Sequence, residues 1–259
     1  MLSEYERARA ILAREVGSRV VAVGAFYGDD EQRPRDFFTA HFFDFGGQWA
    51  MVTAGHCFAG ILENRARGLE PSLVYVYDPN HDSKVPLPIR LEYERMVALA
   101  DDSGIDYGFV PINSMYSTEL ARVGVRPCAI ENVVSPDVPF NTYFLVGYPW
   151  EHTSFRESEK EMKMTIAQTV LQLTPLSEED HKPFQRLQFV CNLDHSPDLP
   201  DLSRIEGMSG GLVIGIRHAT GNTAEVGIVG IQSTWIEKRR RLFVCPHSSF
   251  FNVIRNHVS

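Results

Sequence analysis

The segment Glu206-Gly207-Met208-Ser209-Gly210-Gly211 runs directly into Leu212-Val213-Ile214-Gly215-Ile216. The second part is an apolar, β-branched run that predicts a strand, and the first is a glycine-rich turn that presents a serine at the start of that strand. Short strands separated by Gly, Pro, Asn and Asp clusters continue on both sides of it. We expect them at 20–25, 39–45, 49–53, 73–77 and 105–112, and at 143–146, 163–173, 187–192, 211–216, 226–231 and 242–245. Many short strands without βαβ alternation indicate an antiparallel all-β fold.

Composition limits the classes of function. The 259 residues are 44% hydrophobic and 22% charged, which is typical of a globular protein. The net charge of −8 argues against nucleic-acid binding and against binding to an anionic membrane, and the basic run at 238–241 is expected to be a solvated hairpin tip. No apolar stretch reaches the ~18 residues of a membrane span. The first 16 residues lack the apolar run of a signal peptide.

The four cysteines, at positions 57, 128, 191 and 245, are far apart and form no C-x-x-C pair, so no structural zinc site is expected. Without an export signal they are expected to be reduced thiols, which indicates a cytoplasmic protein. The segment 78–82 resembles the start of a calcium loop but lacks the glycine and glutamate that an EF-hand needs. We expect no metal and no cofactor.

Helices are expected only at the two ends of the chain. Ser3 and Glu6 form a capping box, and Ser248 is a candidate N-cap for a short terminal helix. Apolar residues follow the capping box at Tyr5, Ala8, Ile11, Leu12 and Val16. The segment 117–136 has weak periodicity and is the expected crossover between two halves. The predicted domains are an N-terminal helix at 1–19, an N-terminal barrel at 20–125 and a C-terminal barrel with its helix at 126–259.

Three motifs carry residues that are suited to nucleophilic catalysis. Thr53-Ala54-Gly55-His56-Cys57 follows an apolar run, Ile105-Asp106-Tyr107-Gly108 opens an apolar strand, and the glycine turn holds Ser209. A serine hydroxyl is a poor nucleophile unless an adjacent base takes its proton, and a histidine held in one tautomer by an aspartate is such a base. Asp101 and Asp102 are alternative acids, but neither of them opens an apolar strand.

Together with Gly147-Tyr148-Pro149, these motifs resemble the trypsin-like serine peptidases, bacterial members included, over residues 20–255. The separations, 50 residues from His56 to Asp106 and 103 from there to Ser209, fit that family. The resemblance implies a chymotrypsin-like fold of two six-stranded antiparallel Greek-key barrels. It also implies a serine endopeptidase that forms an acyl-enzyme on Ser209, with His56 as general base and Asp106 as its partner. The amides of Gly207 and Ser209 would form the oxyanion hole, and the substrate would be a protein or peptide.

The chain departs from the family at two places near the expected site. The region 41–47 holds no cysteine to pair with Cys57, which is therefore expected to be free. Met208 stands where zymogen-type relatives carry an aspartate that pairs with a newly cut N-terminus, and the activation sequence Ile-Val-Gly-Gly is absent. The oxyanion hole is therefore either always formed or ordered by an activating partner.

The expected substrate pocket rests on alignment to the serine motif. Ser203 and Arg204 fall at the base of the pocket, which argues against strict Arg/Lys selectivity. Gly230, Ile231 and Gln232 match the strand that pairs with extended substrate. We expect a preference for small or uncharged residues.

Three further functions compete with an always-active endopeptidase. The chain could be a latent or partner-activated protease of a bacterial stress or anti-phage system, by analogy with related cytoplasmic proteins. It could also be a non-catalytic binding module on the same fold, because a fold alone does not fix a function. The turn at Ser209 also satisfies the nucleophile-elbow pattern of α/β-hydrolases. That fold needs a helix after the serine, and here a strand pattern follows it.

Overall fold

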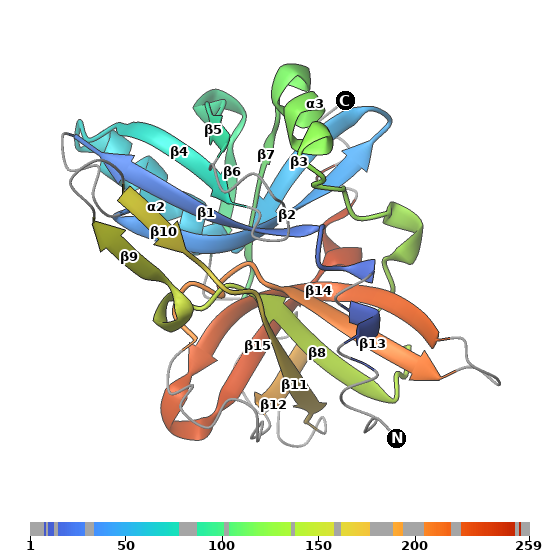
Figure 1. The fold of residues 1–259 in the computed structure, drawn as a ribbon. Helices are drawn as coiled ribbons and strands as arrows, with labels where there is room; N and C mark the ends of the chain where they lie inside the picture. Colours follow the sequence, from blue (N-terminus) through green and yellow to red (C-terminus); the bar gives the residue numbers. More distant parts are fainter. Residues whose placement is uncertain are drawn as a thin grey trace.

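The computed structural model describes residues 8, 10–12, 15–28, 34–77, 87–100, 104–135, 138–157, 162–176, 189–193, 205–218, 224–251 and 254. Within these residues, antiparallel strands form two assemblies that lie one above the other in Figure 1. The upper assembly is built from the first half of the chain and the lower one from the second half. The all-β, two-barrel prediction is therefore confirmed in its main features.

The N-terminal assembly is a seven-stranded sheet in the order β5-β4-β1-β2-β3-β7-β6. Its strands are β1 (Val20–Tyr27), β2 (Asp36–Phe45), β3 (Gln48–Thr53), β4 (Pro71–Tyr77), β5 (Leu87–Ile89), β6 (Val97–Ala100) and β7 (Asp106–Pro111). Strand β4 returns to lie beside β1, which is the Greek-key arrangement. Six strands were expected in this half, and the sheet has seven. The additional strand is the short β5, which pairs with β4 at the edge of the sheet.

The C-terminal assembly is a closed six-stranded barrel in the order β11-β12-β15-β14-β13-β8, as expected. Its strands are β8 (Thr142–Gly147), β11 (Thr169–Pro175), β12 (Phe189–Leu193), β13 (Leu212–His218), β14 (Ala224–Ile236) and β15 (Arg241–Pro246). Strand β13 lies beside β8, so the Greek-key order of the N-terminal sheet is repeated. A separate hairpin joins β9 (Ser154–Glu157) to β10 (Met162–Thr165).

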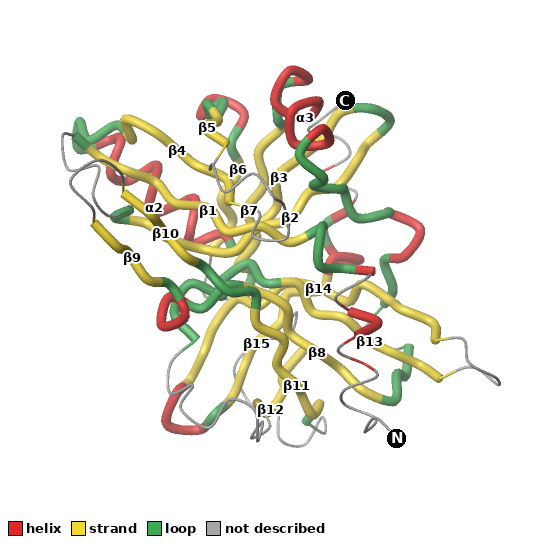
Figure 2. The backbone as a smooth tube through the Cα atoms, viewed as in Figure 1, coloured by secondary structure: helices red, strands yellow, loops and turns green. Residues whose placement is uncertain are grey.

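Two helices were not expected from the sequence, α2 (Gly55–Ala66) and α3 (Ser114–Arg122). Figure 2 shows the helices beside and between the strands. The buried face of α2 consists of Gly55, Phe58, Ile61 and Asn64, so two of its four positions are not large apolar residues and the helical pattern is weak. Short 3₁₀ turns complete the fold: η1 (Tyr93–Arg95), η2 (Ile130–Asn132), η3 (Trp150–His152), η5 (Glu237–Arg239) and η6 (His247–Ser249).

Both ends of the described chain pack into the core between the two assemblies. Residues 8, 10–12 and 15 are helical, and Ala8, Leu12 and Val16 are buried at the spacing that the sequence predicted. Phe250 and Ile254 are buried in the same core, and the amide of Ile254 donates to the Phe250 carbonyl at 3.0 Å. The capping residues Ser3 and Glu6 lie outside the described residues.

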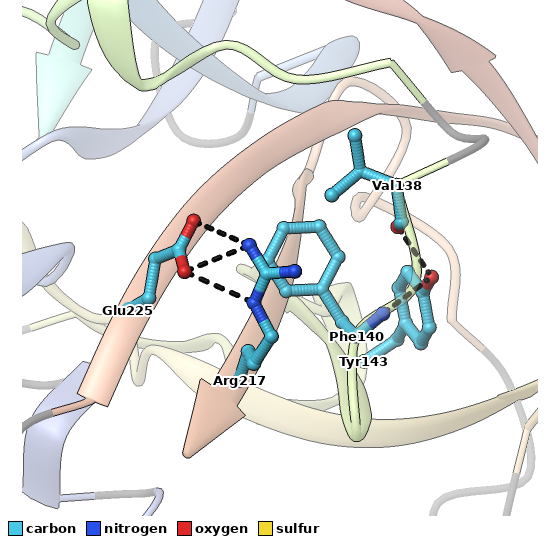
Figure 3. Close-up of polar contacts among 5 residues, drawn as sticks. All are labelled: Val138, Phe140, Tyr143, Arg217 and Glu225. Atoms are coloured by element: carbon cyan, nitrogen blue, oxygen red, sulfur yellow. Dashed lines mark hydrogen bonds and ion pairs between the residues drawn. The ribbon is translucent and has the colours of Figure 1, made fainter. Parts of the chain in front are cut away.

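The connection between the halves is anchored on the C-terminal barrel by Phe140, which packs against the core of that barrel (Figure 3). The ring of Phe140 fills the space that side chains would occupy at Gly215 and Gly227, where an added Cβ would lie 2.3 and 2.4 Å from that ring. The guanidinium of Arg217 lies 5.6 Å from the Phe140 ring centroid and forms a bidentate ion pair with Glu225. These contacts hold β13, the strand that follows Ser209, against β14 and the connecting segment.

Candidate active site

His56 and Asp106 are placed by regular elements that lie side by side. His56 is the second residue of α2, directly after β3, and Asp106 opens β7, which pairs with β3. The ring Nδ1 lies 2.8 Å from Oδ2 of Asp106, and the backbone amide of His56 donates to Oδ1 at 2.8 Å. One carboxylate therefore orients both the ring and the start of the helix. With a proton on Nδ1, the ring leaves Nε2 free to accept a proton, and the His56 side chain is 49% exposed.

This close approach depends on the glycine in the histidine motif. A Cβ on Gly55 would lie 2.0 Å from the carbonyl oxygen of Leu99 in β6 and 2.8 Å from the amide nitrogen of Tyr107 in β7. Since these are backbone atoms, they cannot rotate away. Only glycine lets α2 begin directly against β6 and β7, within reach of Asp106.

The surroundings of His56 favour its charged form. Burial of the ring lowers its pKa, but hydrogen bonding and charge interactions with Asp106 and with the Cys57 side chain outweigh that effect. The pKa of His56 is therefore raised above the ordinary value for histidine. The raised pKa makes the neutral ring a stronger base toward a hydroxyl proton, and Asp106 stabilises the imidazolium that then forms.

The serine loop precedes β13 and is shaped by two glycines. Gly207 and Gly210 have φ angles of 87° and 83°, in the region that favours glycine. The side chain of Met208 is fully buried in the core of the C-terminal barrel. The loop is joined to β14, because the Gly210 amide donates to the Gln232 carbonyl and the Gln232 amide donates to the Gly211 carbonyl, both at 2.8 Å.

The loop contacts the end of the strand that leads to His56. A Cβ on Gly210 would lie 2.1 Å from Oγ1 of Thr53 and 2.3 Å from the carbonyl oxygen of Thr39. Thr53 ends β3, three residues before His56. The Thr39 amide in β2 also donates to the Ser209 carbonyl at 3.0 Å. The structure therefore brings the segments of His56, Asp106 and Ser209 together at the contact between the two assemblies.

Two backbone amides in the serine loop have no internal acceptor. Within the described ranges, neither the Gly207 amide nor the Ser209 amide donates a hydrogen bond. The carbonyl of Glu206 accepts from the Trp150 amide at 2.6 Å. In a trans peptide the carbonyl and the following N–H point in opposite directions, so the Gly207 amide points away from Trp150. Such a pair of amides can stabilise an oxyanion.

Of the five residues expected to bind substrate, two lie outside the described residues and three belong to strand β14. Ser203 and Arg204 lie outside the described residues, as do Asp101, Asp102 and the segment 78–82. Gly230 lies inside the barrel ladder, opposite Val213 on one side and Pro246 on the other. Ile231 is also paired on both sides, with Leu212 and Cys245.

Gln232 uses its backbone within the protein as well, in the two bonds to the glycines after Ser209. Its side chain is buried, and in the described part of the chain Oε1 has no hydrogen-bond partner. The register between β14 and β15 shifts between Gln232 and Trp235, so β14 changes course at Ser233 and Thr234. The sequence prediction did not include these two residues. The pairing of β14 with β13 ends at Ile231, opposite Leu212, and this end point is visible only in the structure.

The rest of the described structure adds three facts. The cysteines at 57, 128, 191 and 245 form no disulfide bond within the described residues. Among the described residues, no group of three or more His, Cys, Asp or Glu side chains could hold a metal ion. No helix in the same part of the chain has the length and apolar character to cross a membrane.

Comparison with known proteins gives matches at the level of structure. No family model and no curated protein matches the chain. The crystal structure of Deg5 is 15% identical with a TM-score of 0.54, over 97% of this chain and 94% of that one. A serine endoprotease from Yersinia pestis is 14% identical with a TM-score of 0.55, over 100% of this chain and 68% of that one.

A thermostable serine protease, AL20, from an extremophilic microorganism is 14% identical with a TM-score of 0.54, over 93% of this chain and 96% of that one. At these identities the likeness shows the fold. The chain has the two-barrel, chymotrypsin-like fold of serine proteases, as its motifs suggested.

Proposed function

We propose that the chain is a serine endopeptidase that cleaves protein or peptide substrates through an acyl-enzyme on Ser209. The observation that carries this proposal is the Asp106–His56 pair beside a serine loop whose amides at 207 and 209 have no acceptor among the described residues. A base with a fixed tautomer and two converging donors are what acyl transfer requires. The fold supports the proposal, since the similar solved structures are those of proteases.

In the proposed reaction the Ser209 hydroxyl oxygen attacks the scissile carbonyl carbon, while Nε2 of His56 takes the hydroxyl proton. The negative charge on the former carbonyl oxygen is stabilised by the amides of Gly207 and Ser209. When the C–N bond breaks, His56 gives its proton to the leaving amine and an ester remains on Ser209. A water molecule then attacks this ester while His56 takes its proton. The bond between the acyl carbon and the Ser209 oxygen breaks, His56 returns the proton to that oxygen, and the acid is released.

The hydrogen bond from Trp150 to Glu206 supports an always-formed oxyanion hole over a latent enzyme. A latent form would need the Gly207 amide turned outward, and the bonded Glu206 carbonyl opposes that turn. We propose that extended substrate pairs with β14 beyond its doubly paired residues Gly230 and Ile231, at the register shift that follows Gln232. The proposal includes a preference for small or uncharged residues at the cleavage site. It also includes a reducing, cytoplasmic location, which is supported by four cysteines without a disulfide bond in the described part of the chain.

A fluorophosphonate probe tests the proposed function. The wild-type protein is expected to be labelled at Ser209, and Ser209→Ala should abolish both labelling and peptide cleavage, because the triad acts as a unit. The matched control is Ser117→Ala, which removes a buried hydroxyl on α3 and should label like wild type. A folded wild-type protein that is never labelled would contradict an always-active enzyme. Labelling only after a cell extract is added would favour partner activation.

A further inference from the structure

Thr39 is connected to the serine loop by two hydrogen bonds. It lies in β2 of the N-terminal sheet and is fully buried. Its amide donates to the Ser209 carbonyl at 3.0 Å, and its Oγ1 donates to the Gly207 carbonyl at 2.8 Å. The same Oγ1 accepts from the Tyr148 amide at 3.0 Å. One residue of the first half therefore binds two carbonyls of the nucleophile loop in the second half.

These bonds fix the peptide planes around the expected oxyanion hole. Trp150 holds the carbonyl of Glu206, which sets the plane of the 206–207 peptide and hence the direction of the Gly207 amide. The Thr39 hydroxyl holds the next carbonyl, that of Gly207 itself, and the Thr39 amide holds that of Ser209. With both neighbouring planes fixed, Gly207 has little freedom to rotate, although a glycine at φ 87° is otherwise permissive.

The Thr39 hydroxyl is itself held in one orientation. Because the Tyr148 amide occupies a lone pair of Oγ1, the hydroxyl proton is directed to the Gly207 carbonyl. Tyr148 belongs to the Gly147-Tyr148-Pro149 turn, and its own hydroxyl donates to the Val20 carbonyl at 3.1 Å. The Thr39 carbonyl accepts from Oγ1 of Thr53 at 2.8 Å, which ties the same residue to the strand end before His56.

We propose that Thr39 is a positioning residue that keeps the oxyanion hole assembled without proteolytic activation. Its hydroxyl orders the serine loop from the neighbouring N-terminal sheet. Met208, the loop residue before the serine, is apolar and buried, so it cannot form an ion pair with a newly cut N-terminus. This inference rests on the proposed peptidase function and adds to it the group that makes the enzyme independent of a trigger.

The test compares Thr39→Val with Thr39→Ser. Valine keeps the shape and removes both hydroxyl bonds, while serine restores the hydroxyl. We expect Thr39→Val to lower kcat by about 10- to 100-fold with little change in KM, since removing a whole oxyanion donor costs about 10²–10³. Thr39→Ser should remain within about threefold of wild type. Binding of a peptide aldehyde, which forms a tetrahedral adduct, should weaken in Thr39→Val, whereas binding of the matching peptide alcohol should not.

The controls separate positioning from folding. Ser117→Ala removes another buried hydroxyl that donates to a carbonyl, that of Ser114, and should leave kcat unchanged. If Thr39→Val does not fold, the Thr39→Ser and Thr39→Ala pair gives the same comparison, because they differ only in the hydroxyl. Equal kcat within either pair, in folded protein, would overturn the role of Thr39 while leaving the peptidase proposal intact. A wild-type protein without reactivity at Ser209 would instead overturn the proposed function itself.

Discussion

The two halves of the molecule share a Greek-key strand order but hold their candidate catalytic residues in different ways. In the N-terminal sheet, His56 and Asp106 come from the start of a helix and the start of a strand, and they bond directly to each other. In the C-terminal barrel, Ser209 stands in a glycine loop that is bonded to β14 of its own barrel and to Thr39 of the N-terminal sheet. The first arrangement is local, and the second depends on the contact between the halves.

This difference predicts that damage in the N-terminal half can abolish catalysis without disturbing the fold. Damage at the contact should instead affect catalysis and stability together. The three predictions below test that distinction, from the largest expected effect to the smallest.

Asp106→Asn should produce the largest selective loss. An amide in place of the carboxylate no longer fixes the proton on Nδ1 of His56, and the equivalent loss of a tautomer-fixing aspartate lowers kcat by about 10⁴. Steady-state cleavage of a peptide substrate measures the change, and thermal unfolding should show a folded protein. Glu63→Gln, an exposed carboxylate on α2 that pairs with Arg67, is the control and should retain full activity. Activity within tenfold of wild type in Asp106→Asn would show that this carboxylate is not the partner of the base.

The same contrast explains what sequence could predict. The His56 and Asp106 motifs lie at the ends of apolar runs, so the pattern itself indicates where the side chains emerge. Most strands were expected within a few residues, because alternation and turn residues are local signals. The helix α2 was missed, since Gly55 and Asn64 interrupt its apolar face.

Contacts between distant segments were beyond prediction for a different reason. Thr39 is an ordinary strand residue in the sequence, and its importance arises from partners 168 and 109 positions away. The expected substrate strand at 230–232 was placed by aligning one motif, and it remains a prediction. The register adds that Gly230 and Ile231 are paired with both β13 and β15. Register depends on the partner strand, which a single sequence does not specify.

Gly210→Ala should damage the contact between the halves. Its Cβ would lie 2.3 Å from the backbone carbonyl oxygen of Thr39, and the residue has a φ of 83°. Gly47→Ala is a matched control, because Gly47 also has a positive φ, 95°, but an added Cβ would meet nothing within 4 Å. The control should lose about 1 kcal/mol of unfolding free energy, the ordinary cost of alanine at such a φ.

We expect Gly210→Ala to lose about 3 kcal/mol or more and to lose activity as well, because the overlap displaces backbone rather than a flexible side chain. Chemical denaturation and peptide cleavage measured on the same samples provide the comparison. Equal losses of stability in the two variants would mean that the serine loop is not held against β2 and β3. A stable but inactive Gly210→Ala would mean that the contact serves geometry alone.

The smallest of the three effects concerns two buried histidines at the same contact. His41 of β2 and His247, just after β15, are fully buried with ring centroids 5.0 Å apart. Nδ1 of His247 is bonded to the Tyr107 hydroxyl at 2.6 Å, and its Nε2 has no hydrogen-bond partner among the described residues. Desolvation lowers the pKa of His41 to about 3, although the Gly210 backbone partly opposes the shift. Desolvation, with a smaller effect of His41, also lowers the pKa of His247 well below its ordinary value.

Because both pKa values are lowered in the folded protein, the unfolded chain binds protons first as the pH falls below about 6.5. The stabilising contribution of the neutral rings is fully present above that pH. Below it, each histidine should reduce the free energy of unfolding by about 1.4 kcal/mol per pH unit. Denaturation curves from pH 7 to pH 5 for wild type, His41→Leu and His247→Leu measure the slope. Each substitution should remove about half of the histidine contribution, whereas an unchanged slope would show that acid sensitivity arises elsewhere and that the contact between the halves does not titrate.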